Sequence, residues 1–175
     1  VGVSIDGPKQ VNDLNRVYHN GKGSFDDVVK GIRRLQASPI INASLGFLLV
    51  IDRTSNPLEM YEFVKELGGA DLLIPDCTHD DKDEGVGNGQ TNIADWLIPI
   101  FNKWFSDPNR PRIRFFNGIV DGVLGGDPGV DTFGEKNNTL LVVETNGDFE
   151  PVDTLKICGD GFTKAGANVR NTSIR

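Results

Sequence analysis

The sequence predicts an α/β fold with a parallel sheet, followed by a smaller β-hairpin module. Strand-like and helix-like segments alternate three times along the first part of the chain, which is typical of βα units joined by right-handed crossovers. The second strand-like segment is almost wholly apolar, as expected for a strand covered on both faces. Near the end, an Asn-Gly pair between two short strand-like segments predicts a hairpin.

The first βα unit begins with Val1–Asp6, where apolar and polar residues alternate up to a turn at Gly7-Pro8. This period of two predicts a short strand. A polar loop is expected from there to Gly23. Ser24 then begins a helix, with Asp27 in the capping-box position three residues later. Apolar residues at helical spacing form its buried stripe: Phe25, Val28, Val29, Ile32 and Leu35.

The second unit combines the apolar strand Ala43–Ile51 with a helix that has clear start and stop signals. Asn56 is a favoured N-cap, Pro57 suits the first helical position, and Glu59 completes a capping box. Gly68 ends the helix. These signals predict a helix from residue 57 to residue 67.

The third unit has a short strand at Ala70–Pro75, an acidic and Gly-rich loop at residues 76–90, and a helix opened by Thr91. Pro99 should kink this helix. A further short helix is expected at Phe115–Leu124.

The hairpin module follows. Its two strands are Leu140–Glu144 and Phe149–Asp153, joined by the turn Thr145–Asp148. This hairpin breaks the βα alternation, so we expect it to begin a second module.

Composition excludes several classes of function. The net charge of -7 disfavours nucleic acid as a partner, because phosphate binding needs clustered Lys and Arg. The basic cluster Lys30, Arg33 and Arg34 falls on a predicted helix and is interpreted as a solvated face. No apolar run is long enough to span a membrane. The two cysteines, Cys77 and Cys158, suggest no disulfide framework and favour a cytoplasmic location.

Candidate site residues follow the predicted strands, because ligands of parallel α/β folds bind beyond the carboxyl ends of the strands. They are Ser4 and Asp6 after the first strand, Asp52 and Arg53 after the second, and Asp76, Cys77 and His79 after the third. A hydroxyl and a carboxylate suit the hydroxyl groups of a sugar, and the planar Arg fork suits a carboxylate.

Each of these groups also has a purely structural interpretation. Asp6 could belong only to the turn at Gly7-Pro8, and Arg53 could be a surface cation near Glu59. The residues after the third strand lack a metal-ligand spacing, so no metal site is predicted there. For Asp6 and Arg53, the structural and the functional interpretation both stay open at this point.

Several segments together resemble radical S-adenosylmethionine (SAM) enzymes that carry a SPASM-type C-terminal extension. The motif Val3–Pro8, followed by Arg16 and by Gly23–Asp26, resembles the fourth barrel strand and following helix of these enzymes. Three further segments are similar to the branch that cross-links ribosomal peptides into three-residue cyclophanes: Leu73–Asp76, Ala94–Leu97 and Val143–Lys156.

The resemblance implies the C-terminal half of a partial (β/α)6 radical SAM barrel, strands four to six, in residues 1–126. It implies the opening β-hairpin of a SPASM-like extension in residues 127–175. The implied activity is that of an oxidoreductase that cleaves SAM at a [4Fe-4S] cluster and cross-links side chains of a ribosomal precursor peptide.

The resemblance also implies site residues. These are Ser4 and Asp6 at the ribose of SAM, Arg53 at its carboxylate, and Ile74 with Pro75 at its adenine. Asp76 and His79 would face the peptide and are the candidate catalytic residues.

The sequence departs from the family in its cysteines. The Cys-x-x-x-Cys-x-x-Cys motif is absent, and two distant cysteines cannot hold a four-iron cluster. We therefore expect a fragment of a longer maturase that is inactive alone and binds neither cofactor productively. Its partners would be the rest of the parent protein or, through an open strand edge, a second copy.

In the extension, Val152 and residues 131–137 occupy the places where the SPASM pattern has cysteines, which predicts fewer auxiliary clusters. In this interpretation the acidic residues Glu144, Glu150 and Asp153 make polar contacts with substrate or neighbouring backbone.

Two alternatives from other classes stay open: a non-catalytic module that binds peptides by strand addition, and a radical-free α/β barrel enzyme that uses Asp6 and Asp76 as acid and base.

Overall fold

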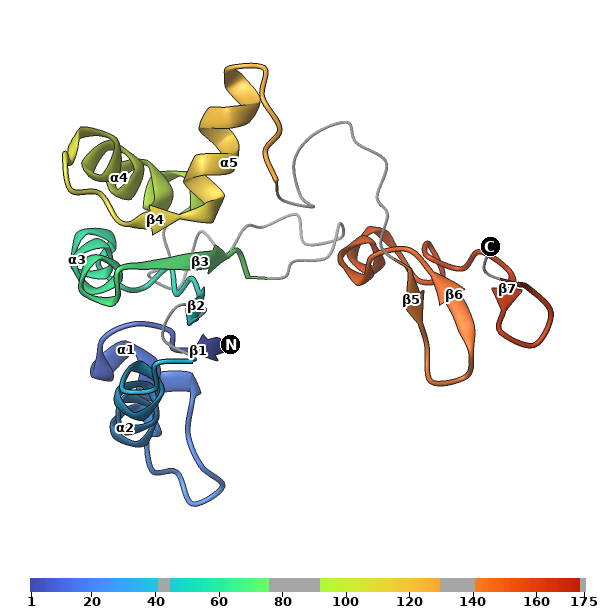
Figure 1. The fold of residues 1–175 in the computed structure, drawn as a ribbon, viewed down its shortest axis with the longest axis horizontal. Helices are drawn as coiled ribbons and strands as arrows, with labels where there is room; N and C mark the ends of the chain where they lie inside the picture. Colours follow the sequence, from blue (N-terminus) through green and yellow to red (C-terminus); the bar gives the residue numbers. More distant parts are fainter. Residues whose placement is uncertain (41–44, 76–91, 130–140, 174–175) are drawn as a thin grey trace. The chain divides into compact units, whose positions relative to one another are not determined.

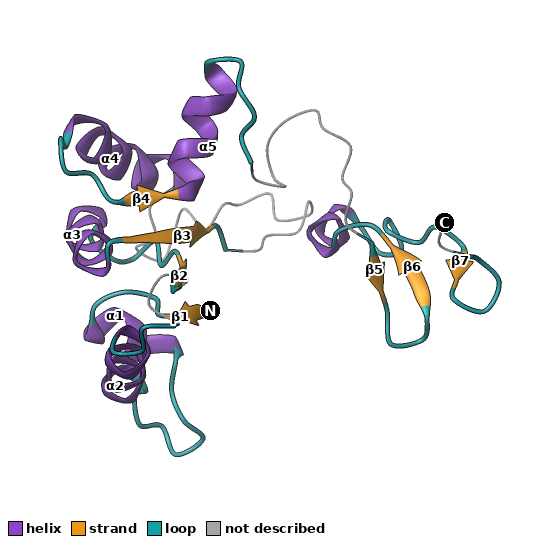
Figure 2. Ribbon diagram, viewed as in Figure 1, coloured by secondary structure: helices purple, strands orange, loops and turns teal. Residues whose placement is uncertain are grey.

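The computed structural model describes residues 1–40, 45–75, 92–129 and 141–173. The chain divides into two compact units, and the described part of the second is residues 141–173. Figures 1 and 2 show the elements of both units. Within the described ranges, every helix is too short or too polar to cross a bilayer.

A parallel sheet forms the centre of the first unit, which confirms the predicted fold class. Its strands are β1 (Gly2–Ser4), β2 (Gly46–Val50), β3 (Gly69–Leu73) and β4 (Arg112–Ile113). They lie in chain order, and each pairs in parallel with the next. The prediction had three strands; β4 was missed because two residues are too few to show a period.

In the described ranges, five α-helices accompany this sheet: α1 (Lys9–Asn15), α2 (Phe25–Gln36), α3 (Pro57–Leu67), α4 (Ile93–Ser106) and α5 (Arg114–Val123). Four of them were predicted within a few residues. The expected loop after Gly7-Pro8 is wrong, because that segment contains α1. Its short sequence is mostly polar and shows a single buried side chain, Asn12, so it carried no apolar stripe. The fourth helix, α4, begins after Asn92 and continues through Pro99.

The core of the first unit lies between one face of the sheet and the helices. Alternate strand residues, such as Leu49 and Leu72, are buried there with Tyr61 of α3 and Trp96 of α4. The strand residues that point to the other face are less buried: Leu48 and Asp71 are intermediate, and Val50 and Leu73 are more than a third exposed. The sheet therefore has one covered face and one open face, whereas an apolar strand had suggested two covered faces.

The two helix starts that carried capping signals differ. At α3 the side chain of Asn56 accepts hydrogen bonds from the backbone of Leu58 and Glu59, and Gly68 closes the helix in the left-handed conformation, as predicted. At α2 the capping box is absent: Ser24 makes no side-chain cap. Instead Asp13 Oδ1 accepts from the Phe25 N–H at 2.9 Å, so a residue of α1 caps α2.

The second unit is a small antiparallel sheet. It contains β5 (Val142–Val143), β6 (Asp148–Glu150), a 3-10 helix η2 (Asp153–Cys158) and β7 (Ala167–Asn168), in the strand order β5-β6-β7. The predicted hairpin is confirmed, with shorter strands. Its turn closes by a bond from the Gly147 N–H to the Glu144 carbonyl, with Gly147 at φ 89°. That is a turn with a glycine bulge.

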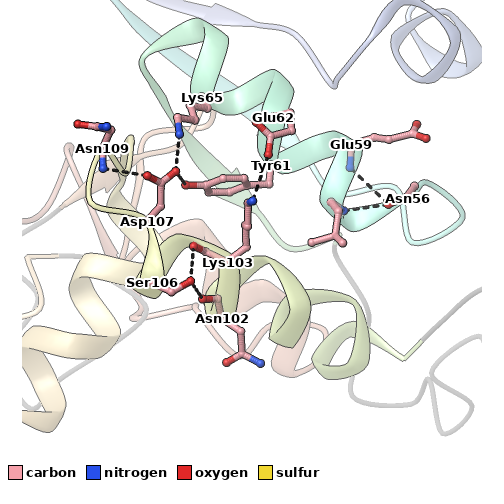
Figure 3. Close-up of polar contacts among 11 residues, drawn as sticks. Asn56, Glu59, Tyr61, Glu62, Lys65, Asn102, Lys103, Ser106, Asp107 and Asn109 are labelled. Carbon is pink, nitrogen blue, oxygen red and sulfur yellow. Dashed lines mark hydrogen bonds and ion pairs between the residues drawn. The ribbon is translucent and has the colours of Figure 1, made fainter.

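A buried polar cluster joins α3 to the end of α4 (Figure 3). Asp107, the C-terminal cap of α4, accepts hydrogen bonds from the Tyr61 hydroxyl at 2.7 Å and the Lys65 ammonium at 2.5 Å. Its other oxygen accepts from the Asn109 N–H at 2.8 Å. The Lys65 hydrogen bond, with that of Tyr61, lowers the pKa of Asp107 to about 2. Burial and the Asp107 contact raise the pKa of Tyr61.

We predict that Tyr61→Phe lowers the free energy of unfolding of the first unit by about 1–2 kcal/mol, because a buried hydroxyl bonded to a carboxylate is lost. The matched control is Tyr18→Phe, whose hydroxyl bonds Asp27 at the exposed surface and should change stability by less than about 0.5 kcal/mol. Urea unfolding followed by tryptophan fluorescence measures this, since Trp96 and Trp104 both lie in the first unit. Equal effects of the two variants would contradict it.

We also predict that Asp107 makes this unit acid-sensitive. Its pKa is lower in the folded state than the ordinary 3.8, so its contribution is complete above that value and is lost as the pH falls toward about 2. Asp107→Asn should start less stable near neutral pH and lose less between about pH 5 and pH 3. Urea midpoints across this range test it, and parallel curves for wild type and variant would refute the assignment.

Candidate functional site

The carboxyl ends of β1, β2 and β3 lie along one edge of the sheet, as the sequence predicted for its candidate residues. The register pairs Ser4 with Leu48 and Leu48 with Asp71, on the face away from the core. Asp6 follows β1 at this edge, Asp52 and Arg53 follow β2, and Ile74 with Pro75 follows β3. Asp76, Cys77 and His79 lie outside the described residues.

Asp6 is bound by three donors of the protein itself. Arg16 donates to both carboxylate oxygens, with Nε at 2.5 Å from Oδ2 and Nη2 at 2.9 Å from Oδ1. The Val50 N–H, at the end of β2, donates to Oδ1 at 3.1 Å. The Asp6 side chain is 13% exposed. Asp6 thus fastens the end of β1 to the end of β2 and to the segment between α1 and α2.

Two further contacts hold this arrangement in place. The Asp6 N–H donates to Oδ1 of Asn12 at 3.2 Å, and Asn12 is fully buried. The backbone carbonyl of Arg16 accepts from Ser24 at the start of α2. A carboxylate has about four acceptor positions, so the Arg16 pair and the Val50 N–H leave one for a ligand. These contacts give Asp6 a positioning role, and the ribose contact that the resemblance implies stays a prediction for the remaining acceptor position.

Ser4 differs from Asp6 in the hydrogen bonding of its side chain. Its side chain is partly exposed on the open face of the sheet, and among the described residues no group hydrogen-bonds to its hydroxyl. A hydroxyl can both donate and accept, which suits a sugar hydroxyl. Of the two residues predicted to contact ribose, Ser4 is thus the better placed for a ligand.

Asp52 and Arg53 start a tight turn after β2. Asp52 Oδ1 accepts from the Thr54 N–H at 2.8 Å and the Thr54 hydroxyl at 2.7 Å. The Asp52 carbonyl accepts from the Ser55 hydroxyl at 2.6 Å, and the Ser55 carbonyl accepts from Trp96 Nε1 at 2.9 Å. This turn is tied to α4, so it gives the half-buried Arg53 a fixed backbone.

The end of β3 offers an apolar surface. Leu73 is 41% exposed and Ile74 is 44% exposed, and Pro75 is half-buried. Flat apolar contact of this kind suits a planar heterocycle, which is compatible with the adenine role that the resemblance implies. Among the described residues no three His, Cys, Asp or Glu side chains gather as metal ligands.

A cavity at the opposite edge of the sheet was not predicted. It has a volume of about 310 Å³ and lies at the amino ends of β2 and β3, beside Gly46, Gly69 and Arg112. Asp71 and Arg114, which form an ion pair at 3.2 Å, also line it. The signal in the sequence was the glycine at the start of β2 and of β3, since neither residue has a side chain to fill the space.

Comparison with known proteins identifies enzymes that mature sulfatases. No family model matches the chain. A serine-type anaerobic sulfatase-maturating enzyme of Bacteroides thetaiotaomicron is 28% identical in an alignment of 174 positions that covers 87% of this chain and 41% of that enzyme. A cysteine-type enzyme of Clostridium novyi is 27% identical over 162 residues, covering 87% of this chain and 42% of that enzyme. The chain thus spans less than half the length of these relatives.

Solved structures agree with the fold. Native anSMEcpe with bound AdoMet superposes on 99% of this chain and 48% of its own, with a TM-score of 0.76 and 22% identity. The same protein with AdoMet and the Kp18Cys peptide gives a TM-score of 0.71 at 21% identity. At this identity the likeness shows the fold. The relatives support the radical SAM part of the resemblance and do not support its cyclophane synthase branch.

We predict that Asp6→Ala destabilises the first unit by about 1.5–3 kcal/mol, because it leaves the Arg16 guanidinium and the Val50 N–H without their acceptor. The control is Asp26→Ala, whose ion pair with Lys9 is more than half exposed and should contribute almost nothing. Urea unfolding of both variants measures the difference. An Asp6 variant as stable as the Asp26 variant would show that the clamp is not structural.

Proposed function

We propose that this chain is part of a longer radical SAM maturase that oxidatively modifies a peptide or protein substrate. The observation that carries the proposal is the alignment of 99% of the chain with AdoMet-bound anSMEcpe, together with Ser4, Arg53 and Ile74 at the carboxyl edge of the parallel sheet. In parallel α/β folds this edge is where ligands bind.

The chain's residues fit SAM but do not fit the cluster that would cleave it. Ser4 offers an available hydroxyl, Arg53 a planar cation and Ile74 an apolar face. A [4Fe-4S] cluster needs several cysteine thiolates, and the 175 residues contain two cysteines. In this proposal the rest of the longer protein holds the cluster, and no step of the chemistry is assigned to residues of this chain.

The substrate in this proposal is a polypeptide. The relatives are named for maturating sulfatases, and two of the related structures hold peptides. The similarity of Val143–Lys156 to cyclophane synthases supports the finer proposal that two side chains are cross-linked. Tandem mass spectrometry of the modified peptide distinguishes a cross-link from a modification of one side chain. A cross-linked ring yields no separate fragments when the backbone inside it breaks, whereas a peptide modified at one side chain fragments along its whole length.

In this proposal the rest of the longer protein packs against the first unit. The open face of its sheet and the unpaired edge of β1 support this. Val50 and Leu73 leave apolar surface uncovered, and β1 has one neighbour among the described strands. An uncovered strand edge favours pairing with another strand. The chain alone should therefore self-associate, and light scattering tests this.

We predict that Ser4→Ala in the longer protein weakens SAM binding roughly five- to ten-fold, the effect of losing one hydrogen bond of about 1 kcal/mol. Its thermal stability should not change, because the hydroxyl has no partner among the described residues. The control is Ser38→Ala, which follows the C-terminal cap of α2 and belongs to none of the segments after β1, β2 or β3. Isothermal calorimetry with SAM decides, and unchanged affinity in Ser4→Ala would remove Ser4 from the site.

A further inference from the structure

The second unit, residues 141–173, presents a problem of stability. Phe149 is the single apolar side chain that is buried among its described residues. Units this small seldom fold on an apolar core alone and usually need disulfides or a structural metal. The described cysteine, Cys158, is free and exposed. A different tie must therefore hold the sheet to the segments after it.

We propose that an ion-pair hub centred on Lys156 holds this unit together in place of an iron–sulfur cluster, so that the unit folds without metal. The hub consists of Lys156, Glu144, Glu150 and Thr163. This inference does not depend on whether the longer protein binds SAM.

The geometry of the hub joins four segments. The Lys156 ammonium, from η2, contacts the Glu144 carboxylate at the end of β5 and lies 3.4 Å from Glu150 Oε2 at the end of β6. Glu150 Oε2 also accepts from the Thr163 hydroxyl at 2.7 Å. Thr163 and Glu150 are 4% and 7% exposed. One ammonium thus links both hairpin strands to η2, and the buried Glu150 adds the turn before β7.

The charges explain why the ammonium is needed. Glu144 and Glu150 place two negative charges beside each other, and the side chain of Glu150 is 8% exposed. A buried carboxylate without a positive partner is strongly destabilising. Lys156 supplies that partner, and the Glu144 hydrogen bond raises the pKa of Lys156 above its ordinary value.

The donor atoms around the hub do not fit a cluster. The SPASM pattern would have cysteines at Val152 and within residues 131–137, and the sequence has none at these positions. Iron–sulfur clusters are held by cysteine thiolates, and the hub offers carboxylates, a hydroxyl and a cation. Within the ranges that the structure describes, no three potential metal ligands gather. Glu144 and Glu150, which were expected to make polar contacts with substrate or neighbouring backbone, both contact Lys156.

A second polar network fixes the far strand. Asn168 of β7 donates to Asp148 Oδ1 at 2.8 Å, and Asn146 of the turn donates to Asp148 Oδ2 at 2.7 Å. A substituted hub would leave this network in place. In a hub variant, the loss of amide protection against hydrogen exchange should therefore be largest where β5, β6 and η2 meet and smaller at the turn.

Hydrogen–deuterium exchange with mass spectrometry of the full chain, purified in the presence of a metal chelator, tests the proposal. The amides of Glu144, Gly147 and Val169 make cross-segment hydrogen bonds and report on the unit. We expect these amides to be protected without metal. In Lys156→Met the Glu144 amide, between β5 and β6, should exchange faster by roughly tenfold or more, the Gly147 and Val169 amides at the turn and β7 should change less, and the first unit should stay unchanged.

Two controls make the result specific. Lys156→Arg keeps a cation and should retain most of the protection. Lys156 and Lys164 both line a cavity of about 360 Å³ in this unit, and Lys164→Met, which leaves the hub intact, should change nothing. Equal protection in Lys156→Met and wild type would overturn the proposal.

Anaerobic addition of ferrous iron and sulfide to the chelated chain is the opposing test. We expect no gain of protection in residues 141–173. Protection that appears with iron and sulfide, and disappears in Cys158→Ala, would show that a cluster holds the unit instead.

Discussion

The carboxylate of Asp6 joins parts of the first unit that strand pairing alone leaves separate. A parallel strand of three residues, such as β1, makes few ladder bonds with its neighbour. By accepting from Val50 and Arg16, Asp6 extends that contact beyond the last paired residues and draws in the segment that leads to α2. The position of Ser4, and with it the candidate ligand edge, depends on this clamp.

The same device recurs in both units. Asp107 collects donors from α3 and from the loop after α4, and Glu150 collects Lys156 and Thr163. In each case a mostly buried carboxylate accepts hydrogen bonds from several segments. These donors offset the cost of burying its charge, and the carboxylate holds the segments together. Short strands and a sheet with one open face give limited apolar burial, and these polar centres supply the missing connections.

The sequence predicted what rests on local periodicity and on cap chemistry. The helix from Pro57 to Leu67 has a cap at each end that acts through its nearest neighbours, and both were found. Helix α1 was missed because its packing depends on the buried Asn12, a polar residue without a period. The Asp6–Arg16 clamp and the Lys156 hub join residues six or more positions apart, and nothing in the spacing of charges distinguishes such pairs from solvated ones.

Several residues that carried the family resemblance have structural roles in this fold. Arg16 follows Asp6 in the motif because the two form a bidentate pair. Gly23 is needed because a side chain there would lie 2.1 Å from the Asp13 carboxylate that caps α2. Since a structural constraint suffices to explain these positions, they argue for the shared fold more strongly than for a shared reaction. Among the residues proposed to contact SAM, Ser4 differs from these positions, because no described contact of the fold requires its hydroxyl. Substituting Ser4 should therefore change the affinity for SAM without changing the free energy of unfolding, which separates ligand binding from stability.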